Sequence, residues 1–79
     1  QDEAPLQPGQ VAVRAPLAGV VSRSVPVGTD VGPGEAVVWI EAMKTETALG
    51  ADVGGVVCEV RVEAGQVVPA GLVVAVIAP

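Results

Sequence analysis

The residue best suited to covalent chemistry is Lys44, the only lysine among the 79 residues of the chain. It lies near the midpoint, within the heptapeptide Glu41 to Thr47, whose sequence is EAMKTET. An amide bond to its ε-amine would remove the positive charge and lengthen the flexible lysine stem. A single lysine on an acidic chain is most often only a solvated charge, so the surrounding sequence must decide between these two interpretations.

The composition gives little support to catalytic or metal-binding chemistry. The chain has no histidine and one cysteine, Cys58, so it can assemble neither a zinc site nor a Ser-His or Cys-His nucleophilic pair. The Gly-Pro-Gly segment at residues 32–34 lacks the strand-to-helix context of a phosphate-binding loop. A lone cysteine also forms no internal disulfide, so nothing demands an oxidising compartment. We therefore predict a non-catalytic protein.

The heptapeptide is predicted to form the tip of a β-hairpin. Apolar segments at Ala36 to Ile40 and Ala51 to Val57 flank it, so the chain should reverse direction around Met43 and Lys44. Hairpin turns with positive φ usually recruit Asn-Gly, Asp-Gly or Gly-Gly, yet the heptapeptide contains no glycine. A local rule that is broken in an otherwise consistent sequence indicates a functional constraint.

The composition favours one small all-β domain. A chain of 79 residues without Phe or Tyr, and with a single Trp, must build its core chiefly from valine. Branched side chains of this kind pack well on sheets. The 10 Gly and 7 Pro indicate many tight turns between short strands. Together these features predict a sandwich or flattened barrel of about seven or eight strands.

The charge and hydropathy patterns exclude two classes of partner. A net charge of −5, with only three scattered arginines beside Lys44, argues against a nucleic-acid surface. No apolar run reaches the roughly 20 residues of a membrane span, and the N-terminus lacks the features of a secretory signal. We therefore expect no nucleic-acid partner, no membrane partner and, by default, a cytoplasmic location.

The two halves of the chain resemble each other. Residues 19–21, Gly-Val-Val, recur as residues 55–57 at a spacing of 36. Gly28 and Gly34 recur as Gly65 and Gly71 at a spacing of 37. The change in spacing predicts a deletion in the first half, or a bulge in the second, between Val21 and Gly28 or their equivalents. A repeat of this kind indicates a pseudo-twofold domain.

Further expectations concern individual segments. Residues 1–10, which are polar, are predicted to be a flexible leader or linker, and residues 11–79 the folded domain. Val20 to Val27 should form one strand, and Trp39 should pack in the core, with a contact to a partner as the alternative. In the second half an alternating pattern places four side chains inward, those of Val56, Cys58, Val60 and Val62. Cys58 is then expected to be a buried, inert thiol.

The motif around the lysine resembles the attachment motif of the biotinyl domain family, whose usual form is E-A-M-K-M-E. The chain reads EAMKTE over residues 41–46, so Thr45 stands where the family usually has a second methionine. The similarity spans roughly residues 11–77 and includes the PLAG segment at residues 16–19 and the repeated glycine turns. The chain is thus similar to the biotin carboxyl carrier domains of biotin-dependent carboxylases and transcarboxylases.

This resemblance sharpens the predicted fold to two four-stranded antiparallel sheets related by a pseudo-twofold axis. It implies that Lys44 lies on a hairpin at one end and the two termini together at the other. Carriers of bacterial acetyl-CoA carboxylases often contain an extra "thumb" in the first half. Only nine residues separate Val21 from Val31, which leaves no room for a thumb. The chain is therefore more similar to the non-thumb carriers of pyruvate and propionyl-CoA carboxylases, transcarboxylase and biotin-dependent decarboxylases.

The resemblance also implies a function, a cofactor and partners. Lys44 would carry covalent biotin, attached by a biotin protein ligase, and shuttle a carboxyl group from a biotin carboxylase site to a carboxyltransferase site. The catalytic groups would belong to those partners, so the chain itself would be no enzyme. Recognition around the lysine would involve its neighbours in the motif, which are Glu41, Ala42, Met43, Thr45 and Glu46.

Two other carriers or modules remain as alternatives. A lipoyl carrier domain of a 2-oxo acid dehydrogenase complex has a similar fold and a modified hairpin lysine, but usually has an acidic residue before that lysine, where this chain has Met43. An unmodified lipoyl-like structural module, as in membrane efflux adaptors, usually lacks the attachment motif and is split by a helical hairpin. Neither alternative fits the motif as well as a biotin carrier does.

Overall fold

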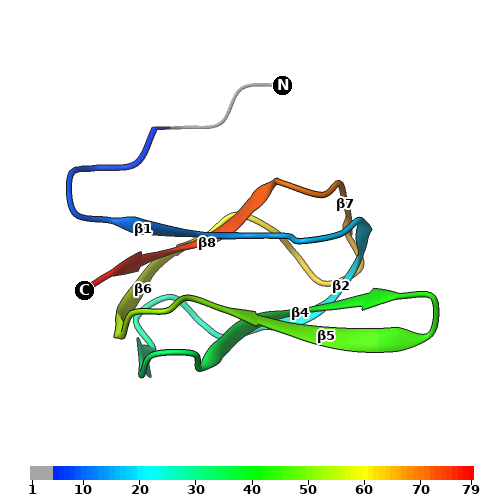
Figure 1. The fold of residues 1–79 in the computed structure, drawn as a ribbon, viewed down its shortest axis with the longest axis horizontal. Coiled ribbons are helices and arrows are strands. Elements are labelled where there is room, and N and C mark those ends of the chain that lie inside the picture. Colours follow the sequence, from blue (N-terminus) through cyan, green and yellow to red (C-terminus); the bar gives the residue numbers. More distant parts are fainter. Residues whose placement is uncertain (1–4) are drawn as a thin grey trace.

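The computed structural model describes residues 5–79, which form two four-stranded antiparallel sheets (Figure 1). One sheet has the strand order β1-β8-β6-β3 and the other β5-β4-β2-β7. The strands are β1 (Val11–Arg14), β2 (Gly19–Ser24), β3 (Asp30–Val31), β4 (Ala36–Ala42), β5 (Thr45–Gly50), β6 (Gly55–Val60), β7 (Val67–Val68) and β8 (Val73–Ala78). The predicted all-β sandwich is thus confirmed. Within residues 5–79 there is no helix long and apolar enough to cross a membrane.

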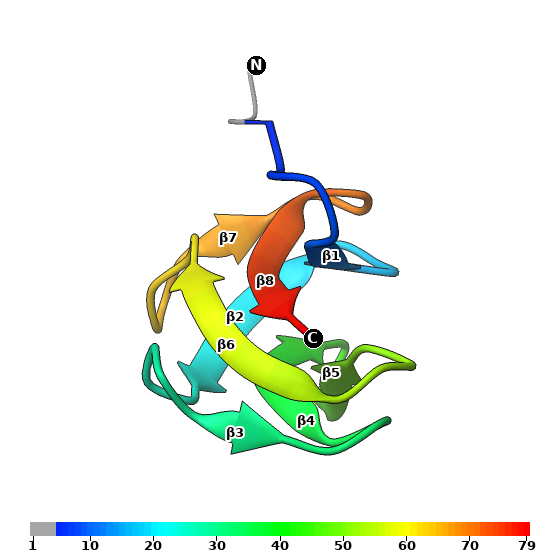
Figure 2. The ribbon, with the colours of Figure 1, turned by 90° about the vertical axis from the view of Figure 1, so that its left-hand side faces the viewer.

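A pseudo-twofold relationship between the halves is confirmed by topology and hydrogen bonding. Replacing β1 to β4 by β5 to β8, and the reverse, converts the strand order of one sheet into that of the other. The amide of Gly28 donates to the carbonyl of Val57 at 2.7 Å, and that of Gly65 donates to Val21 at 2.7 Å. Viewed along the domain, the two sheets enclose one core between them (Figure 2).

The one-residue difference between the repeats lies in a loop. Both halves carry a bulge at the equivalent point, between residues 21 and 23 of β2 and residues 57 and 59 of β6, so a bulge confined to the second half is wrong. The amides of Val25 and Arg61 make equivalent bonds to β4 and β8, and the carbonyls of Pro26 and Glu63 accept equivalent turn bonds. Val62 therefore has no equivalent in the first half. This agrees with the alternative prediction, a deletion in the first half.

The core is built from small aliphatic side chains, as the composition predicts. The largest side chains with no exposed surface are Ile40 and Ile77, joined by valines from both sheets. No buried residue in the described part of the chain is polar or charged. Burial of apolar surface, at about 25 cal/mol per Å², is therefore the main stabilising contribution.

Trp39 is not a core residue, contrary to expectation. It is half-buried on the outer face of β4, where the guanidinium carbon of Arg23 lies 4.1 Å from the centroid of its ring. The ring alternates with its neighbours Val38 and Ile40, both of which are fully buried. Because the aliphatic neighbours fill the core, the aromatic ring is left on the outside.

The predicted alternation of the second half is wrong at its start. Val57 is fully buried, while Val56 is 39% exposed. Val57 therefore points inward and Val56 outward, the reverse of the prediction. The bulge between Val57 and Glu59 adds a residue to the strand and reverses the alternation beyond it, so that Val62 does lie in the core. Cys58 sits in this bulge and is half-buried, not fully buried.

Two predicted strands end earlier or begin later than expected. β2 ends at Ser24 instead of Val27, because the chain turns at Pro26, whose carbonyl accepts a bond from the amide of Thr29 at 3.3 Å. The return arm of the hairpin is Thr45–Gly50, and the next strand starts only at Gly55. Residues 51–54 between them form a bend and not the start of a strand.

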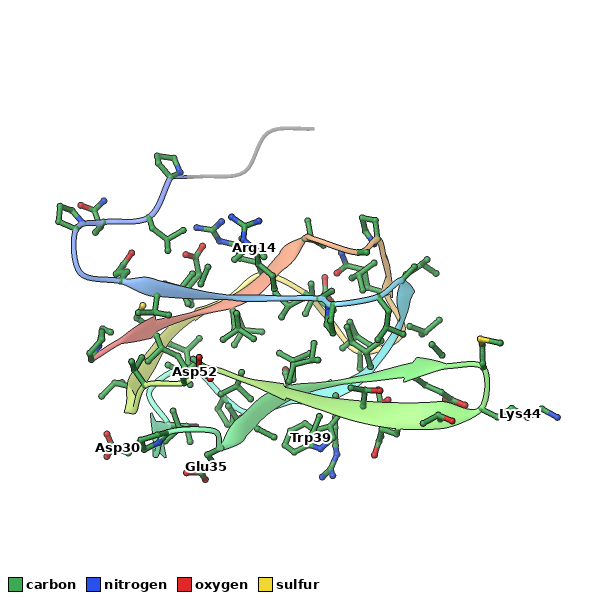
Figure 3. All side chains as sticks on the ribbon, in the orientation of Figure 1. Arg14, Asp30, Glu35, Trp39, Lys44 and Asp52 are labelled. Carbon is green, nitrogen blue, oxygen red and sulfur yellow. The ribbon has the colours of Figure 1, made fainter. Side chains whose placement is uncertain are left out.

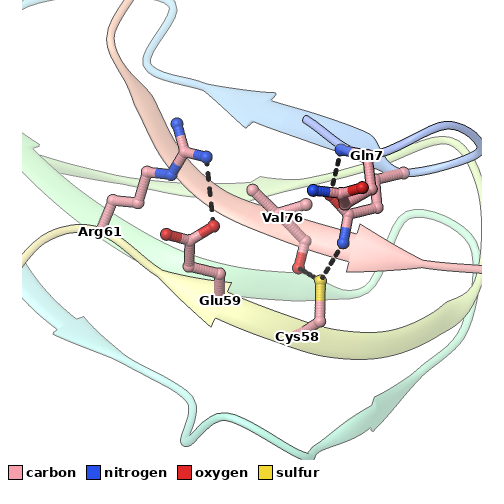
Figure 4. A network of polar contacts seen from close by, with 6 residues as sticks. Gln7, Cys58, Glu59, Arg61 and Val76 are labelled. Atoms are coloured by element: carbon pink, nitrogen blue, oxygen red, sulfur yellow. Dashed lines mark hydrogen bonds and ion pairs between the residues drawn. The ribbon is translucent and has the colours of Figure 1, made fainter. Parts of the chain in front are cut away.

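The segment before β1 is described from residue 5 onward and is largely exposed, with Leu6 and Gln10 half-buried, whereas residues 1–4 lie outside the described residues. Gln7 and Gln10 close a turn, in which the amide of Gln10 donates to the Gln7 carbonyl at 3.1 Å. The Nε2 of Gln10 donates to Cys58 Sγ, which in turn donates to the Val76 carbonyl, each at 3.4 Å (Figure 4). The predicted flexibility of residues 1–10 stays a prediction.

Candidate functional site

The candidate site is the tip of the β4-β5 hairpin. In the register of the two strands Glu41 faces Glu46 and Ala42 faces Thr45, so Met43 and Lys44 form a two-residue turn. Their φ angles are 52° and 66°. Positive φ at both central residues is the requirement of a type I′ turn, the turn that matches the twist of a hairpin. The predicted reversal at these residues is confirmed.

The backbone of this turn is strained. Met43 and Lys44 are the only residues other than glycine with positive φ in the described chain. Left-handed backbone costs a side-chain-bearing residue about 1–2 kcal/mol. The ladder between β4 and β5 imposes this conformation, since both neighbouring pairs are in register. Strain of this kind is tolerated where the side chains at the tip serve a function.

Lys44 is exposed and points away from the body of the domain at the end of the hairpin (Figure 3). Met43 beside it is 97% exposed, so it does not cap the end of the core. An apolar side chain held in water in this way can be covered only by another molecule. The lysine amine is therefore accessible, with an adaptable apolar side chain next to it.

The flanking residues place two carboxylates and a hydroxyl around the lysine. Glu41 and Glu46 face each other as exposed neighbours across the hairpin, and Thr45 is exposed after the turn. With Lys44 protonated, the tip of the hairpin bears one positive and two negative charges. An amide on the lysine would leave only the two negative charges.

All the predicted site residues come together on this one tip, which is formed by residues 41–46. Within residues 5–79 no group of three or more His, Cys, Asp and Glu residues could hold a metal ion. The sequence analysis did not consider Val20, which faces Glu41 across β2 and β4 and is 40% exposed. Its signal was the repeated Gly-Val-Val, whose second residue points outward in both halves.

Comparison with known proteins connects this geometry to a family. A family model described as "Biotin-requiring enzyme" matches residues 11–77, nearly the whole chain. The chain belongs to this biotin-requiring enzyme family. The match covers both pseudo-symmetric halves and the hairpin between them, in agreement with the extent of the resemblance described above.

Relatives of this biotin-requiring domain include a small protein from Mycobacterium leprae described as "Biotinylated protein TB7.3 homolog". It is 41% identical over 66 residues, which cover 82% of this chain and 93% of that protein. The name of this relative describes it as a biotinylated protein. The similarity extends along almost its full length.

Two solved structures contain a similar domain. A single-chain, multi-domain long-chain acyl-CoA carboxylase matches with a TM-score of 0.90 and 38% identity over 98% of this chain. The urea carboxylase of Kluyveromyces lactis matches with a TM-score of 0.83 and 35% identity over 96%. This chain spans only 8% and 7% of the length of those two chains.

These findings support the biotin carrier over both alternatives. The chain is a biotin carboxyl carrier domain of the biotin-requiring family, its cofactor is covalently attached biotin, and the domain itself is non-catalytic. The fold of two four-stranded sheets agrees with that of the biotinyl domains in carboxylases.

Proposed function

We propose that Lys44 is the residue that carries biotin. The observation that supports this most directly is the exposed lysine on a strained two-residue turn, with φ angles of 52° and 66° at Met43 and Lys44. It is also the only lysine in the chain. The site fits the cofactor because a free, accessible amine is what amide formation with the biotin carboxyl group requires.

The hairpin and the lysine have separate mechanical roles in this proposal. The paired strands β4 and β5 hold the tip at a fixed position, while the lysine stem retains its rotational freedom beyond it. Attached biotin supplies an uncharged ring that can carry a carboxyl group. Because Lys44 is tethered to a small rigid domain, the effective concentration of this ring at a partner active site is high.

The residues around Lys44 are proposed to provide recognition. Met43 offers a fully exposed apolar side chain, and Glu41 and Glu46 offer a pair of carboxylates on one face of the hairpin. Ala42 and Thr45 close the turn with little bulk, so an approaching active site can reach the lysine. We propose that a biotin protein ligase reads this combination.

We further propose that the domain serves a biotin carboxylase and a carboxyltransferase, as a domain or subunit of a biotin-dependent carboxylase or transcarboxylase in the cytoplasm. The two similar solved chains, which are carboxylases, support such partners. We propose no nucleic-acid or membrane partner, in keeping with the net charge of −5.

The experiment that tests the attachment residue compares the wild-type chain with Lys44→Arg. Both are incubated with biotin, ATP and a biotin protein ligase, and labelling is followed with a streptavidin blot. We expect the wild type to be labelled and Lys44→Arg to remain unlabelled while its thermal unfolding is unchanged. Labelling of the arginine variant would contradict the assignment of Lys44 as the attachment residue.

A further inference from the structure

The outer face of the β5-β4-β2-β7 sheet carries an uncovered apolar patch. Val67 of β7 faces Val20 of β2. Further along β2, away from the Lys44 tip, Arg23 faces Trp39 of β4. Val20 is 40% and Val67 is 75% exposed. The Arg23 guanidinium stacks on the Trp39 ring at 4.1 Å. We call the surface formed by these four residues the Trp39 face.

The residue equivalent to Trp39 in the other sheet differs in its exposure to solvent. At the repeat spacing of 37, Trp39 corresponds to Val76, whose neighbours Ala75 and Ile77 lie in the core, so Val76 points outward. Val76 is nevertheless fully buried. From the segment before β1, the Gln10 side chain reaches Cys58 beside Val76 (Figure 4). At this position one outer face is thus covered, whereas the equivalent Trp39 of the other sheet is only half-buried.

The Trp39 face is continuous with the hairpin that presents Lys44. Strand β4 carries Trp39 and, two residues later, Glu41, which faces Val20. From Trp39 the extended strand runs for roughly 10 Å to its end at Ala42, and the turn that carries Lys44 follows directly. A partner whose active site receives the lysine at the tip therefore approaches the Trp39 face as well. Figure 3 shows Trp39 and Lys44 on the same hairpin, with Lys44 at its end.

The chemistry of the face indicates what would cover it. Trp and Arg are the side chains most enriched among residues that dominate binding energy at interfaces. No described carboxylate pairs with Arg23. A guanidinium that stacks through its plane still presents its edge to a carboxylate. The matching surface is therefore apolar, with an acidic side chain opposite Arg23.

We propose that the Trp39 face is a docking surface for the biotin carboxylase component, which contacts it while the Lys44 tip enters its active site. This inference rests on the proposed function. Biotin carboxylase is the favoured partner because its half-reaction does not depend on the acceptor. By their descriptions, the two solved carboxylases differ in their acceptors, a long-chain acyl-CoA and urea, yet contain domains similar to this one.

The test uses two valines that the repeat makes equivalent. Val20 is 40% exposed on the Trp39 face and Val56 is 39% exposed on the opposite sheet. Each is replaced by Glu, so the change in charge and volume is identical. The probe is the biotin carboxylase of the single-chain long-chain acyl-CoA carboxylase. Its Kd for the unmodified domain is measured by calorimetry, and its KM and kcat for the biotinylated domain by carrier-dependent ATP hydrolysis.

We expect Val20→Glu to raise both Kd and KM at least fivefold with little change in kcat, and Val56→Glu to change neither by more than twofold. Arg23→Glu should raise Kd as well. Should Val20→Glu lower the unfolding temperature, Val67→Glu at the more exposed position replaces it. Equal effects of the two valine substitutions, or no measurable binding of the wild type, would overturn the docking surface.

Two further measurements separate this inference from the proposed function. Ligase labelling of all variants tests the function: if the wild type is not biotinylated at Lys44, the function fails. If labelling is normal but Val20→Glu and Val56→Glu bind alike, only the docking surface fails. A loss seen with the ligase or a carboxyltransferase, and not with biotin carboxylase, would contradict the partner that we propose.

Discussion

Glu41 and Glu46 face each other directly across β4 and β5, as the second residue pair from the Met43–Lys44 turn. Like charges in directly opposed positions destabilise an antiparallel pair. The hairpin tip therefore combines two unfavourable features, a strained turn and opposed carboxylates. Both features are located at the lysine that we propose to be modified, and they can be tested separately.

The charge pair is tested by Glu46→Gln. We expect this variant to raise the free energy of unfolding by about 0.2–0.5 kcal/mol at low ionic strength, because it removes the repulsion from Glu41. The gain should shrink in 1 M salt, where exposed charges are screened. Urea denaturation at both salt concentrations measures it, with Glu63→Gln as the control outside the hairpin. An equal gain in the control would contradict the pairing.

The strained turn is tested by Met43→Gly. Glycine adopts positive φ without steric cost, but loses more chain entropy on folding. Relief of about 1–2 kcal/mol of strain should therefore leave Met43→Gly more stable than Met43→Ala by roughly 0.5–1 kcal/mol. The alanine variant is the matched control, because it removes the same side chain and keeps the strain. A glycine variant no more stable than the alanine variant would argue against strain at this residue.

The close approach of two strands is tested by Gly55→Ala. A Cβ atom at Gly55 would lie 2.7 Å from the Pro79 Cα and closer still to the Ala78 carbonyl oxygen, so backbone would have to move. We expect a loss of about 1–3 kcal/mol of stability. Gly32→Ala is the control, since its nearest neighbour would be Glu35 Oε1 at 3.8 Å. Similar thermal stability of the two variants would refute the steric account.

The unusual neighbour of the lysine is tested by Thr45→Met. Thr45 is exposed at the tip, so a methionine would add apolar surface for a partner without disturbing the core. We expect kcat/KM of the biotin ligase to rise about fivefold, which corresponds to roughly 1 kcal/mol. Thr45→Ser serves as the control and should leave the kinetics unchanged. Equal kinetics for Met and Thr would show that the position is neutral.

The sequence predicted the features that depend on glycine, proline and repeated patterns. The pseudo-twofold relationship followed from the recurrence of Gly-Val-Val and of the glycine turns, and the turn at Met43 and Lys44 from the apolar segments on either side of it. The missing glycine indicated a functional constraint at the hairpin tip, and the structure has strained left-handed backbone at the same two residues, Met43 and Lys44.

The side-chain directions near the bulges could not be predicted in the same way. A bulge adds one residue to a strand and reverses the faces that follow it, and nothing in the local composition marks it. Val56 and Val57 were exchanged for this reason. Trp39 was assigned to the core by its apolar character, whereas its alternation with the buried Val38 and Ile40 places it on the outer face, where Arg23 lies over its ring.

The central claim is that biotin is attached to Lys44, and the most direct measurement is intact mass followed by peptide mapping. The chain is incubated with biotin, ATP and a biotin protein ligase, and in parallel with lipoate and a lipoyl ligase. We predict the gain of one biotinyl group, located on the peptide that contains Lys44, and no gain with lipoate. Modification by the lipoyl ligase alone, or by neither ligase, would contradict the account.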